Sequence, residues 1–319
     1  MLIFLYGSDG YRLKQAKEEY INRYKAKYPS GVNLFSFDFS VISDINGLDD
    51  ALRISSFFNE HKLLLCYGLF NNKTTAEKIF SLLKSWRINE DQDVTVLIVE
   101  SLPEKDLIAK NKELFNYLSD KKNTIKIIRP LEGADLAKWV KSEFQSRECQ
   151  IQNEVIKKLI DVVGTSSWDL TNEINKLANY SSRGEVKMEY INLLASKSPE
   201  LNIFDLIDTV AQKNKPKAFG LLYKELKSTR DPYYILTMII YQFRNLLMVK
   251  GLQEQGLSQS DIAKKAKLHP FVVKKTETQI KSFQIDELKT KYKKLLEADI
   301  NAKKGDNKLE NYLYNFILN

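Results

Sequence analysis

The chain has 319 residues and a mass of 37.0 kDa, which suggests two or three domains. Hydrophobic residues make up 43% and charged residues 28%, and this composition excludes a low-complexity or disordered chain. The net charge of +8 is concentrated in residues 200–319, which carry 21 basic and 14 acidic side chains. Two cysteines and two histidines are too few for a structural zinc site, and the apolar runs are shorter than the ~18–20 residues that span a bilayer. We therefore expect a folded cytoplasmic protein without metal, cofactor, disulfide or membrane segment.

The first 130 residues alternate between short apolar runs and amphipathic stretches, which is typical of a mostly parallel sheet covered by helices on both faces. The strands are predicted at residues 2–6, 33–39, 63–66, 94–99 and 124–128. The helices are predicted from the Gly-rich turn to residue 27 and at residues 48–58, 74–86 and 107–118. Pro130 ends the series, because proline cannot continue a central strand. The sequence therefore predicts an α/β domain over residues 1–130.

After Gly133 the patterns are helical and no strand is predicted. Short helices are predicted at residues 136–144, 154–163, 168–178 and 188–195, and they form a small helical domain over residues 131–199. Residues 200–319 are predicted to be helical throughout. Their widest apolar stripe, from Leu236 to Leu247, lies on a long helix, with later helices near residues 258–267, 270–280, 285–300 and 309–317. The fold class is α/β plus all-α.

The turn Gly7-Ser8-Asp9-Gly10 stands between the first strand and a helix, where a P-loop would lie. A P-loop is G-x-x-x-x-G-K-[ST], because its glycines let backbone amides wrap phosphate and its Lys neutralises charge. Arg12 stands in place of the second glycine, and no Gly-Lys pair occurs in the chain. Mg²⁺ binding needs an acidic pair after an apolar strand, and Glu100 is a single carboxylate in such a position. We expect no catalysis by this chain on its own.

Seven short segments follow one another in an order and at spacings that mark a known family. They are residues 2–7 with Asp9, 56–58 followed by 62–65, 172–177, 203–208, 241–246, 269–275 and 296–300. Together they resemble the delta subunit of bacterial DNA polymerase III, a clamp-loader subunit, over essentially the whole chain. The resemblance implies an AAA+-like α/β domain with a degenerate P-loop, a small helical lid domain and a C-terminal helical collar for oligomerisation.

The resemblance also implies a job and partners. The chain would bind the sliding clamp (the beta subunit) and open its ring for loading onto primed DNA during replication, without hydrolysing ATP itself. It would work in a hetero-pentamer with gamma/tau and delta-prime type subunits, as part of a polymerase holoenzyme. Its place would be the cytoplasmic, nucleoid-associated replisome.

Phe57 and Phe58, with Ser56 before them, are the candidate clamp-binding residues. On a helix the two aromatic side chains would point about 100° apart, so at least one would be free to enter an apolar pocket of a partner. Burying an exposed Phe contributes about 1.5–3 kcal/mol, and aromatic side chains are common interface anchors. From the residues alone, the alternative is that both pack inward against the strand at residues 63–65.

The C-terminal region supplies further candidates. Gln242 and Arg244, on the long apolar helix, are possible contacts between collar subunits, although Arg244 could equally pair within its own domain. Residues 264–294 contain ten Lys against three acidic side chains, a pattern that favours nucleic acid nearby. The possible DNA-facing residues there are Lys264, Lys265, Lys274 and Lys275. Tyr312, Tyr314 and Phe316 could stack on a base or simply close a helical core.

Two alternative functions remain open at this point. One is a divergent P-loop NTPase that uses residues 7–14, and stabilisation by nucleotide would favour it. The other is a stand-alone basic nucleic-acid-binding protein that works through residues 264–294. Tight and strongly salt-dependent DNA binding by the isolated chain would favour that alternative.

Overall fold

The computed structural model describes residues 1–41, 45–54, 60–86, 88, 93–197, 199–229, 231–305 and 308–318. Contacts divide the chain into two compact units, Met1–Leu131 and Glu132–Asn319. The first unit ends one residue after the predicted α/β domain. The boundary predicted between residues 199 and 200 lies inside the second unit and stays a prediction.

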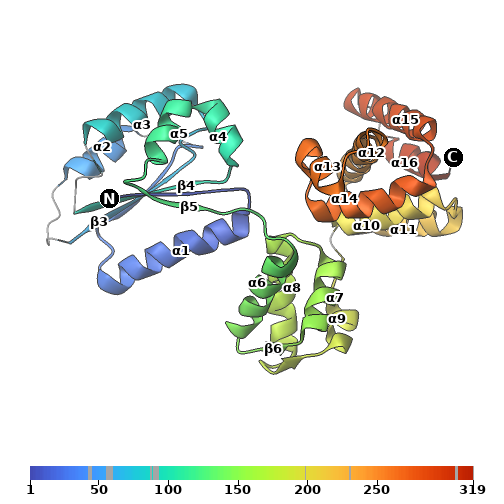
Figure 1. The fold of residues 1–319 in the computed structure, drawn as a ribbon, viewed down its shortest axis with the longest axis horizontal. Helices are drawn as coiled ribbons and strands as arrows, with labels where there is room; N and C mark the ends of the chain where they lie inside the picture. Colours follow the sequence, from blue (N-terminus) through green and yellow to red (C-terminus); the bar gives the residue numbers. More distant parts are fainter. Residues whose placement is uncertain are drawn as a thin grey trace. The chain divides into compact units, whose positions relative to one another are not determined.

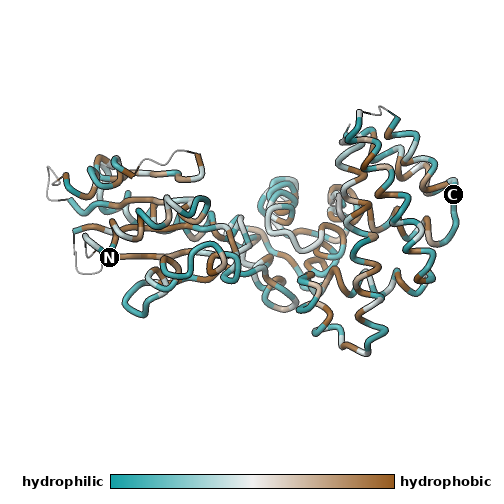
Figure 2. The backbone as a smooth tube through the Cα atoms, turned by 90° about the horizontal axis from the view of Figure 1, so that it is seen from above, coloured by the Kyte–Doolittle hydropathy of each residue, from teal (hydrophilic) through white to brown (hydrophobic). Residues whose placement is uncertain are grey.

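The first unit is built on a five-stranded parallel sheet with the strand order β2-β3-β4-β1-β5 (Figure 1). Its strands are β1 (Leu2–Tyr6), β2 (Leu34–Asp38), β3 (Lys62–Tyr67), β4 (Val94–Glu100) and β5 (Thr124–Ile127). Each lies within one residue of its predicted limits. β1 is buried along its whole length, as is expected for a strand covered on both faces. In Figure 2 the chain that starts at the N-terminus is drawn mostly in brown, the colour of hydrophobic residues.

Helices cover both faces of this sheet (Figure 1). One face carries α1 (Gly10–Lys27), and the other carries α2 (Ile45–Arg53), α3 (Lys73–Ser85), α4 (Glu104–Lys110) and α5 (Lys112–Leu118). The alternation of side chains along β1 separates the two cores. Ile3 and Leu5 pack in the cluster that contains α1, whereas Leu2 and Phe4 pack in the cluster that contains α2, α3 and α5.

Two helices of this unit differ from their predicted limits. The helix predicted at residues 107–118 is interrupted at Asn111, whose backbone is extended. Its side chain accepts a hydrogen bond from the Leu114 N–H at 2.9 Å and so begins a new helix, which is the usual role of Asn at a helix start. The helix predicted at residues 48–58 begins at Ile45 and ends at Arg53, and the predicted residues 55–58 lie outside the described part of the chain.

The second unit begins with α6 (Gly133–Gln145), α7 (Asn153–Val163), α8 (Ser167–Tyr180) and α9 (Met188–Leu194). The prediction that no strand follows Gly133 is wrong, because β6 (Gln150–Ile151) and β7 (Glu185–Val186) pair in parallel. Two residues per strand are too few to give an alternating pattern that a sequence reading could detect. The helical predictions for this region are confirmed.

The rest of the second unit is helical, as predicted. It contains α10 (Pro199–Ala211), α11 (Lys215–Thr229), α12 (Pro232–Glu254), α13 (Gln259–Ala266), α14 (Pro270–Gln279), a short 3₁₀ turn (Ile280–Ser282), α15 (Ile285–Lys303) and α16 (Leu309–Leu318). These helices share one hydrophobic core, with Phe243 of α12 fully buried between the rings of Phe283 and Phe316. By length and composition alone α12 could cross a membrane, but half of its apolar stretch is buried among the other helices, as in the core helix of a soluble domain.

Candidate functional site

Ser56, Phe57 and Phe58 lie outside the described residues, so their clamp-binding role stays a prediction. The described chain brackets them on both sides, between α2, which ends at Arg53, and β3, which begins at Lys62. The structure describes the residues on either side, at the end of α2 and at the start of β3.

The C-terminal end of α2 is held by the side chain of Lys62, which is only 6% exposed. The Lys62 ammonium donates hydrogen bonds to the carbonyls of Ala51 and Leu52, both at 3.0 Å, and of Ile54 at 2.5 Å. Carbonyls in the last turn of a helix have no partner within the helix, and a cation there is also favoured by the helix dipole. Lys62 therefore caps α2 from the beginning of the next strand.

The two residues before β3, Glu60 and His61, are held by separate contacts. The Glu60 carboxylate accepts a hydrogen bond from the Ser30 hydroxyl at 2.9 Å. The carbonyl of His61 accepts one from the Tyr24 hydroxyl at 2.8 Å, and its ring Nε2 lies 2.7 Å from the Thr95 hydroxyl oxygen. The chain therefore enters β3 at a well-defined position.

α2 is also held along its side. The Asp49 carboxylate accepts hydrogen bonds from the indole N–H of Trp86 at 2.8 Å and from the Arg53 Nε–H at 2.9 Å. These bonds, first that of Trp86 and then that of Arg53, lower the pKa of Asp49 below its ordinary value. The middle of α2 is thus fixed against the end of α3, independently of Lys62.

The turn between β1 and α1, where a P-loop would bind phosphate, is short and internally bonded. Only three residues separate Tyr6 from Gly10, the first residue of α1. The Gly7 N–H donates to the carbonyl of Glu100 at 3.1 Å, and the Asp9 N–H donates to the carbonyl of Ile128 at 3.4 Å. Both amides are therefore used by the ends of neighbouring strands.

The start of α1 already holds a negative charge. The buried Asp9 carboxylate accepts a hydrogen bond from the Arg12 N–H at 3.2 Å and forms an ion pair with the Arg12 guanidinium at 3.5 Å. A helix start attracts anions because its first N–H groups are unpaired and its dipole is positive there. The Asp9 carboxylate occupies this position, and its negative charge would repel a phosphate.

Glu100 lies at the carboxyl end of β4, near the middle of the sheet, and is 3% exposed. Its carboxylate accepts the Leu69 N–H at 2.6 Å. Burial raises the pKa of Glu100 to about 7, while the hydrogen bonds from the amides of Leu69 and Phe70 act in the opposite direction. Asp38, at the end of β2, adds a smaller upward effect on this pKa. Glu100 thus holds the connection that follows β3.

The two candidate collar residues have different environments. Gln242 is buried at 2% exposure, and its Nε2 donates to the Gln279 Oε1 at 2.5 Å. Gln279 in turn donates to the carbonyl of Phe204 at 2.9 Å, so this network links α10, α12 and α14 within one domain. Arg244 is exposed, and its guanidinium lies over the ring of Tyr241 at 5.3 Å from the ring centre. An intersubunit contact must lie at the surface, and of the two residues Arg244 does so.

The four candidate DNA-facing lysines are all exposed. Lys264 and Lys265 lie in the last turn of α13, and Lys274 and Lys275 lie on α14. Lys265 donates to the side chain of Gln255 at 3.4 Å, a contact that leaves its charge at the surface. Their positions are compatible with phosphate contacts, and their role stays a prediction.

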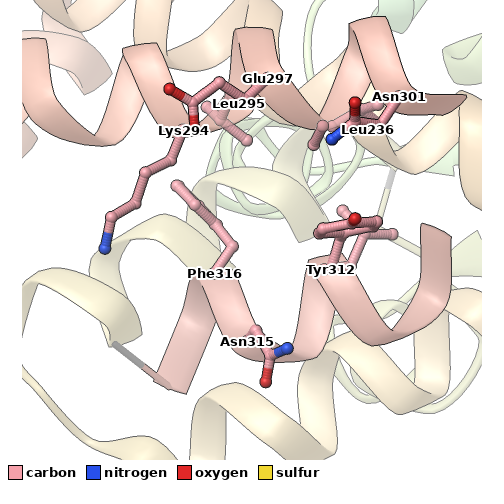
Figure 3. A pocket seen from close by; sticks show the side chains of 10 residues that line it. Leu236, Lys294, Leu295, Glu297, Asn301, Tyr312, Asn315 and Phe316 are labelled. Carbon is pink, nitrogen blue, oxygen red and sulfur yellow. The ribbon is translucent and has the colours of Figure 1, made fainter. Parts of the chain in front are cut away.

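A pocket of about 190 Å³ lies between α15 and α16 in the same unit (Figure 3). Tyr312 and Phe316 extend from α16 toward α15, and Leu236 of α12 contributes to the lining. Phe316 is buried, and its ring packs in a T-shaped arrangement with that of Phe243, with 5.3 Å between the ring centres. Phe316 therefore closes the core. Tyr314 instead stacks on the half-exposed ring of Phe219 at 4.8 Å.

Residues 200–319 match the sequence model of the DNA polymerase III delta subunit, C-terminal domain. The DNA polymerase III subunit delta of Bacillus subtilis (strain 168) is 25% identical over 327 residues, covering 98% of this chain and 91% of that protein. Residues 200–319 therefore match the C-terminal domain of this family, and the whole chain is similar to a DNA polymerase III delta subunit. A probable DNA polymerase III subunit delta of Aquifex aeolicus (strain VF5) is 22% identical over 134 residues, or 41% of this chain and 38% of that protein.

The solved structure of the Bacillus subtilis DNA clamp loader delta protein is similar with a TM-score of 0.67 and 24% identity, covering 99% of this chain and 94% of that one. This chain therefore has the AAA+-like α/β and helical fold that the resemblance implied. This likeness shows the fold, and the sequence matches relate the chain to the delta subunit of DNA polymerase III.

Sequence reasoning did not find the contacts made by Lys62. The residue was noted only as part of a family segment, although a Lys at the first position of the buried run Lys62-Leu63-Leu64-Leu65 is itself a signal. A charged side chain is rarely buried unless its charge is paired or hydrogen-bonded, so its position predicts a partner inside the domain. Which carbonyls serve as that partner could come only from the fold.

Proposed function

We propose that this chain is a non-catalytic clamp-loader subunit that binds the sliding clamp and opens its ring for loading onto primed DNA. The likeness to the Bacillus subtilis delta subunit over 98% of the chain carries this proposal. Phe57 and Phe58, with Ser56, would make the clamp contact.

The geometry of the first unit supports a non-catalytic role. The turn between β1 and α1 uses the amides of Gly7 and Asp9 internally, and the Asp9 carboxylate occupies the helix start where a nucleotide phosphate would bind. Glu100 is engaged with the amide of Leu69. We expect Mg²⁺ and ATP to leave the melting temperature of the isolated protein unchanged, because a ligand that binds the native state would raise it. A rise would favour the divergent NTPase.

Clamp opening would follow from a difference in affinity between two ring geometries. Aromatic side chains that bind a distorted clamp interface more tightly than the closed one shift the equilibrium toward the open ring. The size of the shift is set by the difference between the two binding free energies. No chemical step is required of this chain. ATP chemistry would come from motor subunits of the gamma/tau type.

The remaining partners follow from the same proposal. The domain formed by α10–α16 would join the gamma/tau and delta-prime type subunits in a hetero-pentamer, with Arg244 exposed for such a contact. The exposed lysines of α13 and α14 would face primed DNA only within the assembled loader. Such a complex works in the bacterial cytoplasm, at the replisome.

The test is binding of the isolated protein to its sliding clamp. We expect a Phe57→Ala, Phe58→Ala double variant to bind at least about 100-fold more weakly than the wild type, because each buried Phe contributes about 1.5–3 kcal/mol. The matched control is Phe219→Ala, Tyr223→Ala, which removes two half-exposed aromatic side chains from α11. Circular dichroism would verify that both variants fold.

Wild-type protein that does not bind the clamp would contradict the proposed function, and an unaffected double variant would contradict the proposed site. Ring opening has its own assay. A clamp linked to closed circular DNA can leave only if one of its interfaces opens, so the wild type should accelerate clamp release and the double variant should not.

A further inference from the structure

β5 forms one edge of the parallel sheet, and among the described residues no strand pairs with its outer side. All four of its residues, Thr124–Ile127, are exposed, whereas the neighbouring strand β1 is buried along its whole length. An unpaired strand edge presents a row of N–H and C=O groups that can pair with a further strand. Sheets bind extended peptides in this way.

The direction of the backbone groups of β5 follows from its pairing with β1. The Ile128 N–H donates to the carbonyl of Tyr6 at 2.7 Å, so it points toward β1. Backbone groups alternate in direction along a strand, so those of Lys126 point toward β1 as well. The N–H and C=O groups of Ile125 and Ile127 therefore point away from the sheet. These two residues supply two donors and two acceptors for a further strand.

The side chains of β5 give this edge an apolar face and a charged face. Ile125 and Ile127 are 36% and 43% exposed, so part of each apolar surface contacts water. They lie on the same face of the strand, because successive side chains alternate. Lys126 lies on the other face, where it forms an ion pair with Glu19 of α1 at 3.6 Å. A strand that paired with β5 would cover the two isoleucines with every second side chain.

The charge around β5 indicates which kind of strand would pair with it. Residues 119–129 contain four cationic side chains and a single acidic one, Asp120. The cations are Lys121, Lys122, Lys126 and Arg129, and all four are exposed. Like charges on facing strands are unfavourable, so a second copy of β5 would be a poor partner for this edge. Carboxylates on the added strand would be favoured instead.

We propose that the outer edge of β5 is a binding site for an extended segment of a partner protein in which apolar and acidic side chains alternate. The segment adds a strand to the sheet and forms backbone hydrogen bonds with Ile125 and Ile127. Its apolar side chains cover these isoleucines, and its carboxylates lie on the face of Lys126. The site does not involve the candidate clamp-binding residues, so the proposal does not depend on clamp binding.

The test uses the full chain and a short fluorescent peptide in which Val and Glu alternate, because Val favours strands and Glu supplies carboxylates. A peptide with the same composition, but with all Val residues before all Glu residues, tests the alternation. A peptide in which Lys replaces Glu tests the charge. Fluorescence anisotropy measures the dissociation constants, and amide hydrogen exchange shows which backbone groups the peptide protects.

Two proline variants separate backbone pairing from a general change in the fold. Ile125→Pro removes an N–H that points outward, so it blocks the added strand without removing a hydrogen bond from the sheet. Ser36→Pro is the matched control in β2, at the opposite edge. The Phe39 N–H donates to the carbonyl of Tyr67, so by the same alternation the Ser36 N–H points outward. Circular dichroism verifies that both variants fold.

We expect the alternating peptide to slow exchange of the Ile125 and Ile127 amides by at least about tenfold. The Lys126 amide should change little, because it already points toward β1. This alternation of protected and unchanged amides is specific to an added strand. Ile125→Pro should weaken binding by at least about tenfold, and Ser36→Pro should leave it unchanged.

The charge is tested by Lys121→Glu, Lys122→Glu, which keeps the strand itself unaltered. We expect this variant to bind the alternating peptide about tenfold more weakly than the wild type, because two attractive charges become repulsive. The difference should shrink at high salt, since surface charges are screened. This measurement decides the role of charge even if the proline variant does not fold.

Failure of the alternating peptide to bind at about 1 mM would overturn the inference. So would equal binding of either control peptide, or protection confined to amides outside β5. Displacement of the peptide by a single-stranded oligonucleotide would show that these cations bind nucleic acid. A molecular mass that doubles with concentration in the wild type, but not in Ile125→Pro, would show that a second copy pairs with β5. Either result would overturn the inference as well.

Discussion

The carboxylate of Glu100 accepts the backbone N–H of Leu69 at 2.6 Å and so ties the end of β4 to the connection after β3. Open α/β sheets bind their ligands at the carboxyl ends of the strands, where this bond lies. A carboxylate in such a place could serve catalysis, but here it is buried and bonded to the backbone of its own domain. The same burial makes the stability of the fold depend on pH.

Glu100→Gln should change that pH dependence. Burial raises the pKa of Glu100 from an ordinary value of 4.5 to about 7, so the folded protein holds this proton more tightly than the unfolded chain. The resulting stabilisation is present below the unfolded pKa and is lost as the pH rises through the folded one. Gln cannot ionise and escapes this loss, so the variant should gain roughly 3 kcal/mol relative to the wild type between about pH 4.5 and about pH 8.

Urea denaturation across that pH range measures the difference. Glu113→Gln is the control, because Glu113 is an exposed carboxylate on α5 of the same unit. If the stability curves of Glu100→Gln and the wild type run parallel, the buried carboxylate does not titrate as described.

Asp9→Ala should destabilise the first unit by about 1 kcal/mol, because Asp9 accepts the Arg12 N–H at the start of α1 and Ala offers no acceptor. Asp9→Asn keeps an oxygen in the same place and should retain most of the stability. Urea denaturation of the three proteins tests this order. Equal losses for Ala and Asn would mean that the ion pair with Arg12 matters more than the cap.

Gln242→Ala should destabilise the second unit by about 1–3 kcal/mol, because it leaves the buried Gln279 without one of its partners. A double-mutant cycle with Gln279→Ala isolates the interaction, and we expect a coupling of about 1 kcal/mol. Independent effects of the two substitutions would contradict the buried network. Arg244→Ala is the control and should leave the stability nearly unchanged, because its side chain is exposed.

Replacing the four exposed lysines of α13 and α14 by Gln should weaken DNA binding by the assembled loader in a salt-dependent way. The residues are Lys264, Lys265, Lys274 and Lys275. A plot of log affinity against log salt concentration has a negative slope. For duplex DNA, each lost phosphate contact should make this slope less steep by about 0.9. Fluorescence anisotropy over a salt series measures this slope.

The control removes the same charge from exposed lysines of the first unit. These are Lys105, Lys112, Lys121 and Lys122. Equal slopes for the wild type and the α13–α14 variant would exclude a role for those four lysines in phosphate contact. Tight binding by the isolated wild type, lost in that variant, would instead favour a stand-alone nucleic-acid-binding protein.

The sequence predicted the α/β unit well because its signals are local. β1 is a compact apolar run ended by a Gly-rich turn, and each side chain's position in the run decides which face of the sheet it covers. The break at Asn111 was missed because a capping Asn inside an amphipathic stretch does not interrupt the apolar spacing. β6 and β7 were missed because two residues cannot show a period.

The site was less predictable, because its main contacts join distant positions. Gln242 lies within the span of an apolar stripe, and the pattern alone does not distinguish an exposed polar side chain from a buried one bonded to Gln279, 37 residues later. The contacts of Lys62 depend on where β3 lies relative to the end of α2. The clamp-binding role of Phe57 and Phe58 came from family likeness, and it stays a prediction.

The short turn between β1 and α1 restricts what mutation can do to this protein. A Cβ atom on Gly7, whose φ is +150°, would lie 1.9 Å from the carbonyl oxygen of Ile128, so any side chain there would push the turn away from β5. A nucleotide-binding loop needs four residues between its two glycines, whereas α1 begins three residues after Gly7. Point substitutions therefore cannot convert this turn into a phosphate-binding loop. A redesign of this turn to wrap a phosphate would start by lengthening the connection between β1 and α1.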